Sequence, residues 1–255
     1  MRIWPHFAAL LVLGASCLSP AEERVELDRE VGRAQAAGLA VAVDDGLATV
    51  RSLSSTALVL WGSAPGFAWS VTANEPTELE LEIQNCLVDA ELQVTAGDAQ
   101  LSSLGAAETP TRQRWRLQLP AGETRLELAA PDAGSLEPFD FALLSDIQEA
   151  VDHVADVFDK LNAQTGLRFL LGAGDLTQRG TREELERFQR ELLRLQIPYF
   201  TTLGNHELGT HPDLFHEYFG RGSFQFRFHG VAFTLLDDAS ATLDPTTYDW
   251  LEGWL

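Results

Sequence analysis

The sequence predicts an α/β sheet with flanking helices in its second half, preceded by a small all-β, sandwich-like domain. Two observations predict this order. Residues 40 to about 130 alternate apolar and polar side chains in short runs, as strands with one buried face do. Residues 139–202 instead alternate continuous apolar runs with segments of helical spacing, which is typical of βαβ units. We therefore divide the chain into residues 1–20, 21–135 and 136–255.

Composition and charge restrict the class of partner. The 255 residues are 45% apolar, and 18 Lys and Arg stand against 38 Asp and Glu, for a net charge of −20. Such a protein repels phosphate backbones, so we expect no general nucleic-acid binding. A small phosphate-ester substrate stays compatible with this charge, because a bound cation reverses the local field. The two cysteines form no CxxC pair, and Cys86 beside Leu87 is expected to be an inert core thiol.

The first twenty residues resemble a secretory signal peptide. The stretch Phe7–Ser16 is apolar and too short to span a bilayer, and the chain becomes polar at Ala21–Arg24. A buried helix is the alternative. Within this segment Leu13–Cys17 resembles a bacterial lipobox, although Gly14 stands where Leu is usual. We therefore expect an exported protein of the cell envelope or the extracellular space, with membrane attachment only through a lipid on Cys17.

Elements of the first folded part follow from the alternating pattern. Residues 22–37 predict a short polar helix, and several strands within about ninety residues favour a small β-sandwich. The clearest strands are residues 78–83, 114–119 and 124–128. No cluster of His, Cys or paired carboxylates occurs in this part, so we interpret it as a packing, spacing or binding module. Residues 131–135 are turn-rich and form the expected linker.

Elements of the second part follow from apolar runs and helical spacing. Residues 149–162 and 182–195 carry apolar side chains at helical intervals. A further helix is expected from Thr246 onward. The predicted strands are residues 139–144, 168–172, 197–202, 223–228 and 231–236.

Polar side chains follow three of these strands at the point where each one ends. The blocks are Ser145–Gln148, Gly172–Gly180 and Gly204–Glu207. In open α/β sheets the carboxyl ends of the strands are where ligands bind. Carboxylate, amide and imidazole groups suit Mn²⁺, Fe²⁺ or Zn²⁺, and a carboxylate bridging two such ions is a layout that activates water against phosphate esters.

The three blocks resemble the calcineurin-like metallophosphoesterase family, whose pattern is D-x-H/Q, then GD-x-x-x-R, then GNH-E/D. The resemblance extends from about Phe139 to the C-terminus. It implies two divalent metal ions, with Mn, Fe and Zn as the candidates. It further implies that Asp146 and Gln148 hold the first ion, that Asp175 bridges, and that Asn205 holds the second.

The same resemblance implies catalytic roles for two further residues. His206 would lie near the phosphate, where it protonates the leaving oxygen or stabilises the transition state. Arg179 matches an Arg that contacts phosphate in some members of the family. Gln178 stands where purple acid phosphatases carry a metal-binding Tyr, which argues against that branch.

The chain departs from the family pattern in two places. Gln148 replaces the commoner His, and the sequence stops at Leu255 before the strands that carry three further His ligands. The remaining histidines are expected to be surface or hydrogen-bonded polar residues; they are His153, His211, His216 and His229. We therefore expect a fragment of a longer protein, with a naturally truncated product as the alternative.

Two functions from different classes follow from these expectations. The first is an exported dimetal phosphoesterase that hydrolyses a phosphomonoester or phosphodiester. The alternative is a catalytically incomplete envelope protein that retains the fold as a binding or scaffolding module. Nucleotide binding through Gly172–Gly174 is disfavoured, because no third glycine completes the G-x-G-x-x-G spacing. The sequence leaves the substrate and the oligomeric state open.

Overall fold

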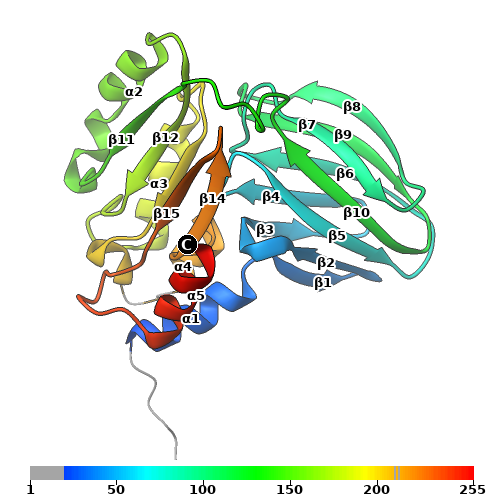
Figure 1. The fold of residues 1–255 in the computed structure, drawn as a ribbon, viewed down its shortest axis with the longest axis horizontal. Helices are drawn as coiled ribbons and strands as arrows, with labels where there is room; N and C mark the ends of the chain where they lie inside the picture. Colours follow the sequence, from blue (N-terminus) through cyan, green and yellow to red (C-terminus); the bar gives the residue numbers. More distant parts are fainter. Residues whose placement is uncertain (1–19, 210, 212) are drawn as a thin grey trace, which may run out of the picture.

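The structure of the protein is a computed structural model that describes residues 20–209, 211 and 213–255 (Figure 1). Residues 1–19 of the expected signal peptide (1–20), with the Cys17 lipidation site, lie outside the described residues. Within the described part, none of the helices combines the length and apolar character needed to cross a membrane.

The first half of the described chain forms two five-stranded sheets. Their strand orders are β1-β2-β5-β10-β7 and β3-β4-β6-β9-β8, and the described pairings are antiparallel except for the parallel pair β4 and β6. The strands are β1 Arg33–Ala36, β2 Leu39–Val43, β3 Ala48–Leu53, β4 Ala57–Gly62, β5 Phe67–Ala73, β6 Thr77–Gln84, β7 Glu91–Ala96, β8 Gln100–Ala106, β9 Arg112–Leu119 and β10 Gly122–Ala129. A short 3-10 turn, η1 Asp44–Gly46, precedes β3.

Alternation in the sequence places one face of each central strand in a shared core. In β6 the side chains of Leu79, Leu81 and Ile83 are buried. The intervening Glu78 and Glu80 point outward, and they pair with arginines of β9, Arg116 and Arg114 respectively. The residues predicted as strands at 78–83, 114–119 and 124–128 lie within β6, β9 and β10.

The N-terminal helix α1, Pro20–Glu30, is shorter than the helix predicted over residues 22–37. Gly32 has a φ of +83°, and a Cβ at this position would lie 2.7 Å from Cβ of Val43. The backbone therefore leaves the helical conformation here, and residues 33–36 pair with β2 instead.

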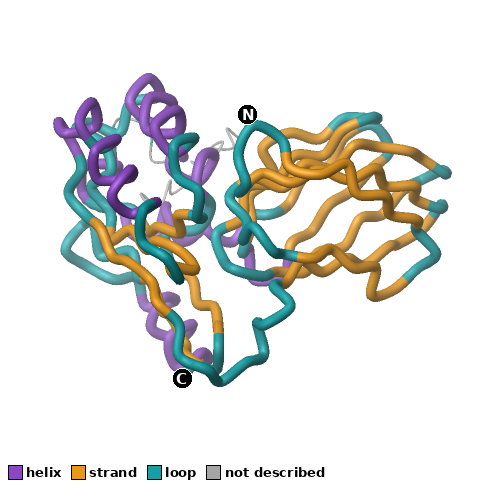
Figure 2. The backbone as a smooth tube through the Cα atoms, turned by 90° about the horizontal axis from the view of Figure 1, so that it is seen from above, coloured by secondary structure: helices purple, strands orange, loops and turns teal. Residues whose placement is uncertain are grey.

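The second half of the chain forms a parallel sheet of order β11-β12-β13, followed by the hairpin β14-β15. Helices α2 and α3 lie along one side of this sheet, and the strands of the first half lie on the opposite side (Figures 1 and 2). The elements are β11 Asp140–Leu144, η2 Gln148–His153, α2 Ala155–Asn162, β12 Leu167–Ala173, α3 Arg182–Leu192, β13 Tyr199–Thr202, η3 Asn205–Leu208, α4 Asp213–Phe219, β14 Phe224–Phe228, β15 Val231–Leu235 and α5 Pro245–Trp254.

Two helices of this half begin in different ways. Thr181 caps α3 in a capping box with Glu184, so the helix begins where the sequence predicts it. The helix predicted over residues 149–162 instead begins as the 3-10 segment η2 and becomes α-helical only at Ala155.

An aromatic cluster joins the hairpin to the parallel sheet. Phe169 of β12 is fully buried, and its ring lies 5.5–5.8 Å from six other Phe rings on β11, β13, β14 and β15 and just before β11. These rings belong to Phe139, Phe141, Phe200, Phe226, Phe228 and Phe233. Most of them continue directly into the core of the five-stranded sheets, so the two halves share one apolar interior.

Helix α1 packs against the second half through a buried polar network. The guanidinium of Arg24 donates to both carboxylate oxygens of Asp237, at 2.5 and 3.1 Å. The carboxylate of Asp28 accepts the backbone N–H groups of Gly222 at 2.7 Å and Ser223 at 3.1 Å. These contacts fix the segments that flank the β14-β15 hairpin.

Candidate metal centre

Three loops meet at the carboxyl ends of β11, β12 and β13. The backbone carbonyl of Asp175 accepts hydrogen bonds from the N–H groups of Ile147 at 2.9 Å and Gln148 at 3.2 Å. The N–H of Asp146 reaches the carbonyl of Gly174 at 3.4 Å. The first loop is therefore tied to the second through the main chain of residues 174 and 175.

The Asp175 side chain connects the second loop to the other two. Its carboxylate accepts the backbone N–H of His206 at 3.1 Å and the amide Nε2 of Gln148 at 3.3 Å. This side chain is the point on which all three loops converge.

The backbone at three of the four expected metal ligands has a left-handed conformation. The φ angles are +55° at Asp146, +43° at Gln148 and +55° at Asp175. A positive φ is uncommon for residues other than glycine, and such strain persists only where the surrounding contacts impose it. Strain of this kind is common at binding and catalytic sites, so it makes the first and second loops candidates for function.

Two glycines allow the second and third loops to touch. A Cβ on Gly174 would lie 2.5 Å from the backbone nitrogen of Gly204, and a Cβ on Gly204 would lie 2.0 Å from Oδ1 of Asp175. Both distances are shorter than any real carbon contact, so neither position accepts a side chain without displacing Asp175 or its neighbours.

His206 is held by its imidazole as well as by its main chain. Nδ1 lies 2.7 Å from the carbonyl oxygen of Gln178. Because a carbonyl only accepts, Nδ1 carries the hydrogen, and Nε2 is the ring nitrogen that this contact leaves unengaged. The side chain is half-buried.

The other expected site residues lie closer to solvent. Asp146 and Asn205 are exposed, and Oδ2 of Asp146 accepts the hydroxyl of Ser145 at 2.5 Å. Arg179 is also exposed; its backbone N–H donates to Glu184, which ties the end of this loop to α3. The structure therefore brings Asp146, Gln148, Asp175 and His206 together through contacts in which the exposed Arg179 takes no part.

Glu207 is a site-associated residue to which the sequence reasoning assigned no role. Its side chain is almost fully buried, and its carboxylate accepts hydrogen bonds from Asp175, Thr177 and Gly204. Burial raises the pKa of this carboxyl, and the hydrogen bonds from Gly204 and Thr177 oppose that rise. Its place in the G-N-H-E block is the only sequence signal that points to it.

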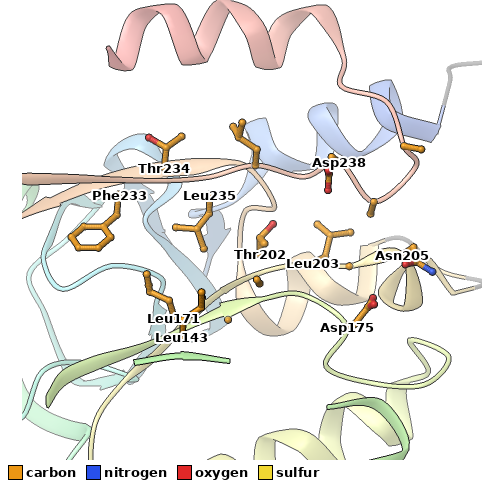
Figure 3. A pocket seen from close by; sticks show the side chains of 16 residues that line it. Leu143, Leu171, Asp175, Thr202, Leu203, Asn205, Phe233, Thr234, Leu235 and Asp238 are labelled. Carbon is orange, nitrogen blue, oxygen red and sulfur yellow. The ribbon is translucent and has the colours of Figure 1, made fainter. Parts of the chain in front are cut away.

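A pocket of about 740 Å³ opens beside these loops. Asp175, Asn205 and Asp238 surround one end of it, and apolar side chains such as Leu171 and Phe233 line the other (Figure 3). Asp238, which follows strand β15, was not among the expected site residues. Its signal in the sequence is the one that marked the other loops, a carboxylate placed directly after an apolar strand.

The donor set fits a divalent cation through oxygen ligands. It consists of the carboxylates of Asp146 and Asp175 and the amides of Gln148 and Asn205. Gln148 directs its Nε2 toward Asp175, so a cation between them requires the amide to turn its oxygen inward. Among the described residues, no group of three or more His, Cys, Asp or Glu side chains is arranged to hold a metal.

The other histidines of the described residues lie away from these loops. His153 and His211 are exposed. His216 is buried, and its Nε2 lies 3.0 Å from Asp28. His229 is buried as well, with Nδ1 at 2.7 Å from the carbonyl of Glu137.

Comparison with known proteins finds a family match over the part of the chain that contains these loops. Residues 139–249 match the sequence model of the calcineurin-like phosphoesterase family, which supports the resemblance seen in the three blocks. The matched segment contains every expected site residue and covers less than half of the chain. No curated protein sequence matches the chain.

Proposed function

We propose that this protein is a metal-dependent hydrolase of phosphate esters, acting on a phosphomonoester or a phosphodiester at a dinuclear site. The observation that carries this proposal is the convergence of three strand-end loops on Asp175, with left-handed backbone at Asp146, Gln148 and Asp175. The match of residues 139–249 to the phosphoesterase family supports the same chemistry.

Each expected metal ligand is assigned to one of the two ions according to the loop that carries it. Asp146 and Gln148 would hold one ion, Asn205 the other, and Asp175 would face both. Divalent cations in such a site neutralise charge on the phosphoryl group and make the attacking water more acidic. Among the candidate ions Mn²⁺ suits this donor set best, because carboxylate and amide oxygens favour it over the ions that prefer imidazole.

His206 supplies the proton in this scheme. Its Nδ1–H is engaged by the Gln178 carbonyl, so the ring is oriented with Nε2 available. A protonated Nε2 beside the phosphate donates to the leaving oxygen, and a positioned acid of this kind contributes about 10²–10⁴-fold to the rate. The exposed Arg179 would meet the negative charge of an entering phosphate.

We further propose an exported setting, in the cell envelope or outside the cell, where residues 1–20 act as a signal peptide and Cys17 is the point of any lipid attachment. The substrate is a small phosphate ester. A general nucleic-acid partner is disfavoured by the net charge of −20.

A specific observation favours a second candidate function. Among the described residues the site has no cluster of three His, Cys, Asp or Glu side chains. A catalytically incomplete protein that keeps the fold as a binding or scaffolding module would show this feature.

Hydrolysis of p-nitrophenyl phosphate and bis-p-nitrophenyl phosphate with added Mn²⁺ tests the proposal. We expect turnover that depends on the metal, disappears in Asp175→Ala and persists in Asp156→Ala, which removes an exposed carboxylate of α2. Mn²⁺ binding without turnover on either compound would favour the binding module. Absence of both metal binding and turnover would contradict the phosphoesterase proposal.

A further inference from the structure

We infer that Glu207 is the positioning residue of the site, which holds the Asp175 loop and the Gly204–His206 turn in the geometry that binds metal. This inference rests on the proposed function. Glu207 does not line the pocket and is 1% exposed, so it acts through its neighbours rather than on a substrate.

Each oxygen of the Glu207 carboxylate accepts two hydrogen bonds. Oε2 accepts the backbone N–H groups of Asp175 at 2.9 Å and Gly204 at 2.8 Å. Oε1 accepts the backbone N–H and the hydroxyl of Thr177, both at 2.9 Å. One carboxylate thus joins two loops that are about thirty residues apart in the chain.

This arrangement requires a group that only accepts. A carboxylate offers two oxygens, whereas a glutamine amide of the same shape offers one oxygen and one NH₂ group. In Glu207→Gln, an NH₂ group on the Oε2 side leaves the N–H groups of Asp175 and Gly204 without their acceptor. On the Oε1 side it leaves the N–H of Thr177 without its acceptor, while the Thr177 hydroxyl can turn and accept from the NH₂ group. Unsatisfied buried donors of this kind are among the more costly defects in a folded protein.

The two loops joined by Glu207 carry the expected metal ligands. Its bond to the Asp175 N–H fixes a residue whose φ is +55° and whose carboxylate receives the N–H of His206. Its bond to Gly204 fixes the residue that precedes Asn205. Groups that orient metal ligands in this way typically change metal affinity by about 10–100-fold when they are removed.

Asp28 provides a matched control for the substitution. It is also a buried carboxylate that accepts two backbone N–H groups, from Gly222 and Ser223, and it lies outside the three loops. Its remaining partner is Nε2 of the buried His216, at 3.0 Å. Asp28→Asn therefore causes the same chemical change at a site that carries no expected ligand.

The experiment compares wild type, Glu207→Gln and Asp28→Asn by amide hydrogen exchange and by Mn²⁺ titration calorimetry. In Glu207→Gln we expect faster exchange at Asp175 and Gly204 or at Thr177, according to which side takes the NH₂ group, with Mn²⁺ affinity reduced by about 10–100-fold. In Asp28→Asn we expect faster exchange at Gly222 and Ser223 and an unchanged Mn²⁺ affinity. Because Glu207→Gln could fail to fold, Glu207→Asp is measured as well, and we expect it to restore part of the Mn²⁺ affinity.

The outcomes separate this inference from the proposed function. A folded Glu207→Gln protein with wild-type exchange at the three amides, or with wild-type Mn²⁺ affinity, overturns the positioning role. An equal loss of Mn²⁺ affinity in Asp28→Asn overturns it too, because general destabilisation then explains the effect. If the wild type binds Mn²⁺ but hydrolyses no phosphate ester, the proposed hydrolase activity fails while the positioning role stands.

Discussion

The Oδ1 atom of Asp175 accepts the backbone N–H of His206 at 3.1 Å, although the two residues are 31 positions apart in the chain. This contact brings the end of β12 to the end of β13, and it places the expected bridging carboxylate beside the expected proton donor. It leaves the His206 ring free to be held by Gln178. The position of Asp175 and the chemistry of His206 are therefore separable by mutation.

Replacement of His206 should lower turnover without weakening metal binding. In His206→Asn the backbone N–H that contacts Asp175 remains, and only the imidazole is lost. We expect kcat to fall by about 10²–10⁴-fold, with Mn²⁺ affinity unchanged in calorimetry. His153→Asn, which removes an exposed imidazole, should match the wild type. A parallel loss of metal binding in His206→Asn would show that the ring is a ligand rather than a proton donor.

A side chain at Gly174 should lower the free energy of unfolding by more than the positive φ angle alone explains. The reason is that the neighbouring loop leaves no space for a Cβ. Gly174 and Gly105 have nearly equal φ angles of +83° and +82°, but a Cβ at Gly105 meets nothing within 4 Å. Gly105→Ala should lower the free energy of unfolding by about 1–2 kcal/mol through the left-handed backbone.

Gly174→Ala should lower that free energy by a further 1–3 kcal/mol or so, because its Cβ collides with Gly204. Urea denaturation of both variants measures the difference. Equal losses in the free energy of unfolding for Gly174→Ala and Gly105→Ala would contradict this, because the two loops would then move apart at no cost in stability.

The ion pair between Arg24 and Asp237 should be important for stability, since both side chains are more than nine-tenths buried. Arg24→Met leaves the Asp237 carboxylate buried without its cation, which should cost about 3–5 kcal/mol in the free energy of unfolding. Arg29→Met breaks the exposed pair with Glu26 and should cost about 0–1 kcal/mol. Chemical denaturation compares the two, and similar values would contradict the assigned burial of the Arg24 pair.

Cys86 should be unreactive in the folded protein. Its side chain is fully buried, and desolvation raises the pKa of the thiol to about 12. At pH 8 the nucleophilic thiolate is therefore almost absent in the native state. In a Cys17→Ser variant, Ellman's reagent should label Cys86 slowly in buffer and completely in urea. Rapid stoichiometric labelling in buffer would place this thiol at the surface.

Local pattern alone was sufficient to predict the elements that carry the site. Apolar runs ending in polar blocks predicted β11, β12 and β13 and the three loops that follow them, and the structure brings those loops together. Strict alternation likewise predicted strands within β6, β9 and β10. These features depend on neighbouring residues and on side-chain periodicity, which a sequence displays directly.

Residue types and their spacing specified the donor groups of the candidate site, namely two carboxylates, two amides and a histidine at the ends of three strands. Long-range contacts that only the folded chain makes join two of those loops through Glu207, bring Asp238 to the pocket, and pair Arg24 of α1 with Asp237. The physical reason is range. Arg24 and Asp237 are 213 residues apart. The periodicity of neighbouring residues carries no information about which buried charges pair at such a distance along the chain.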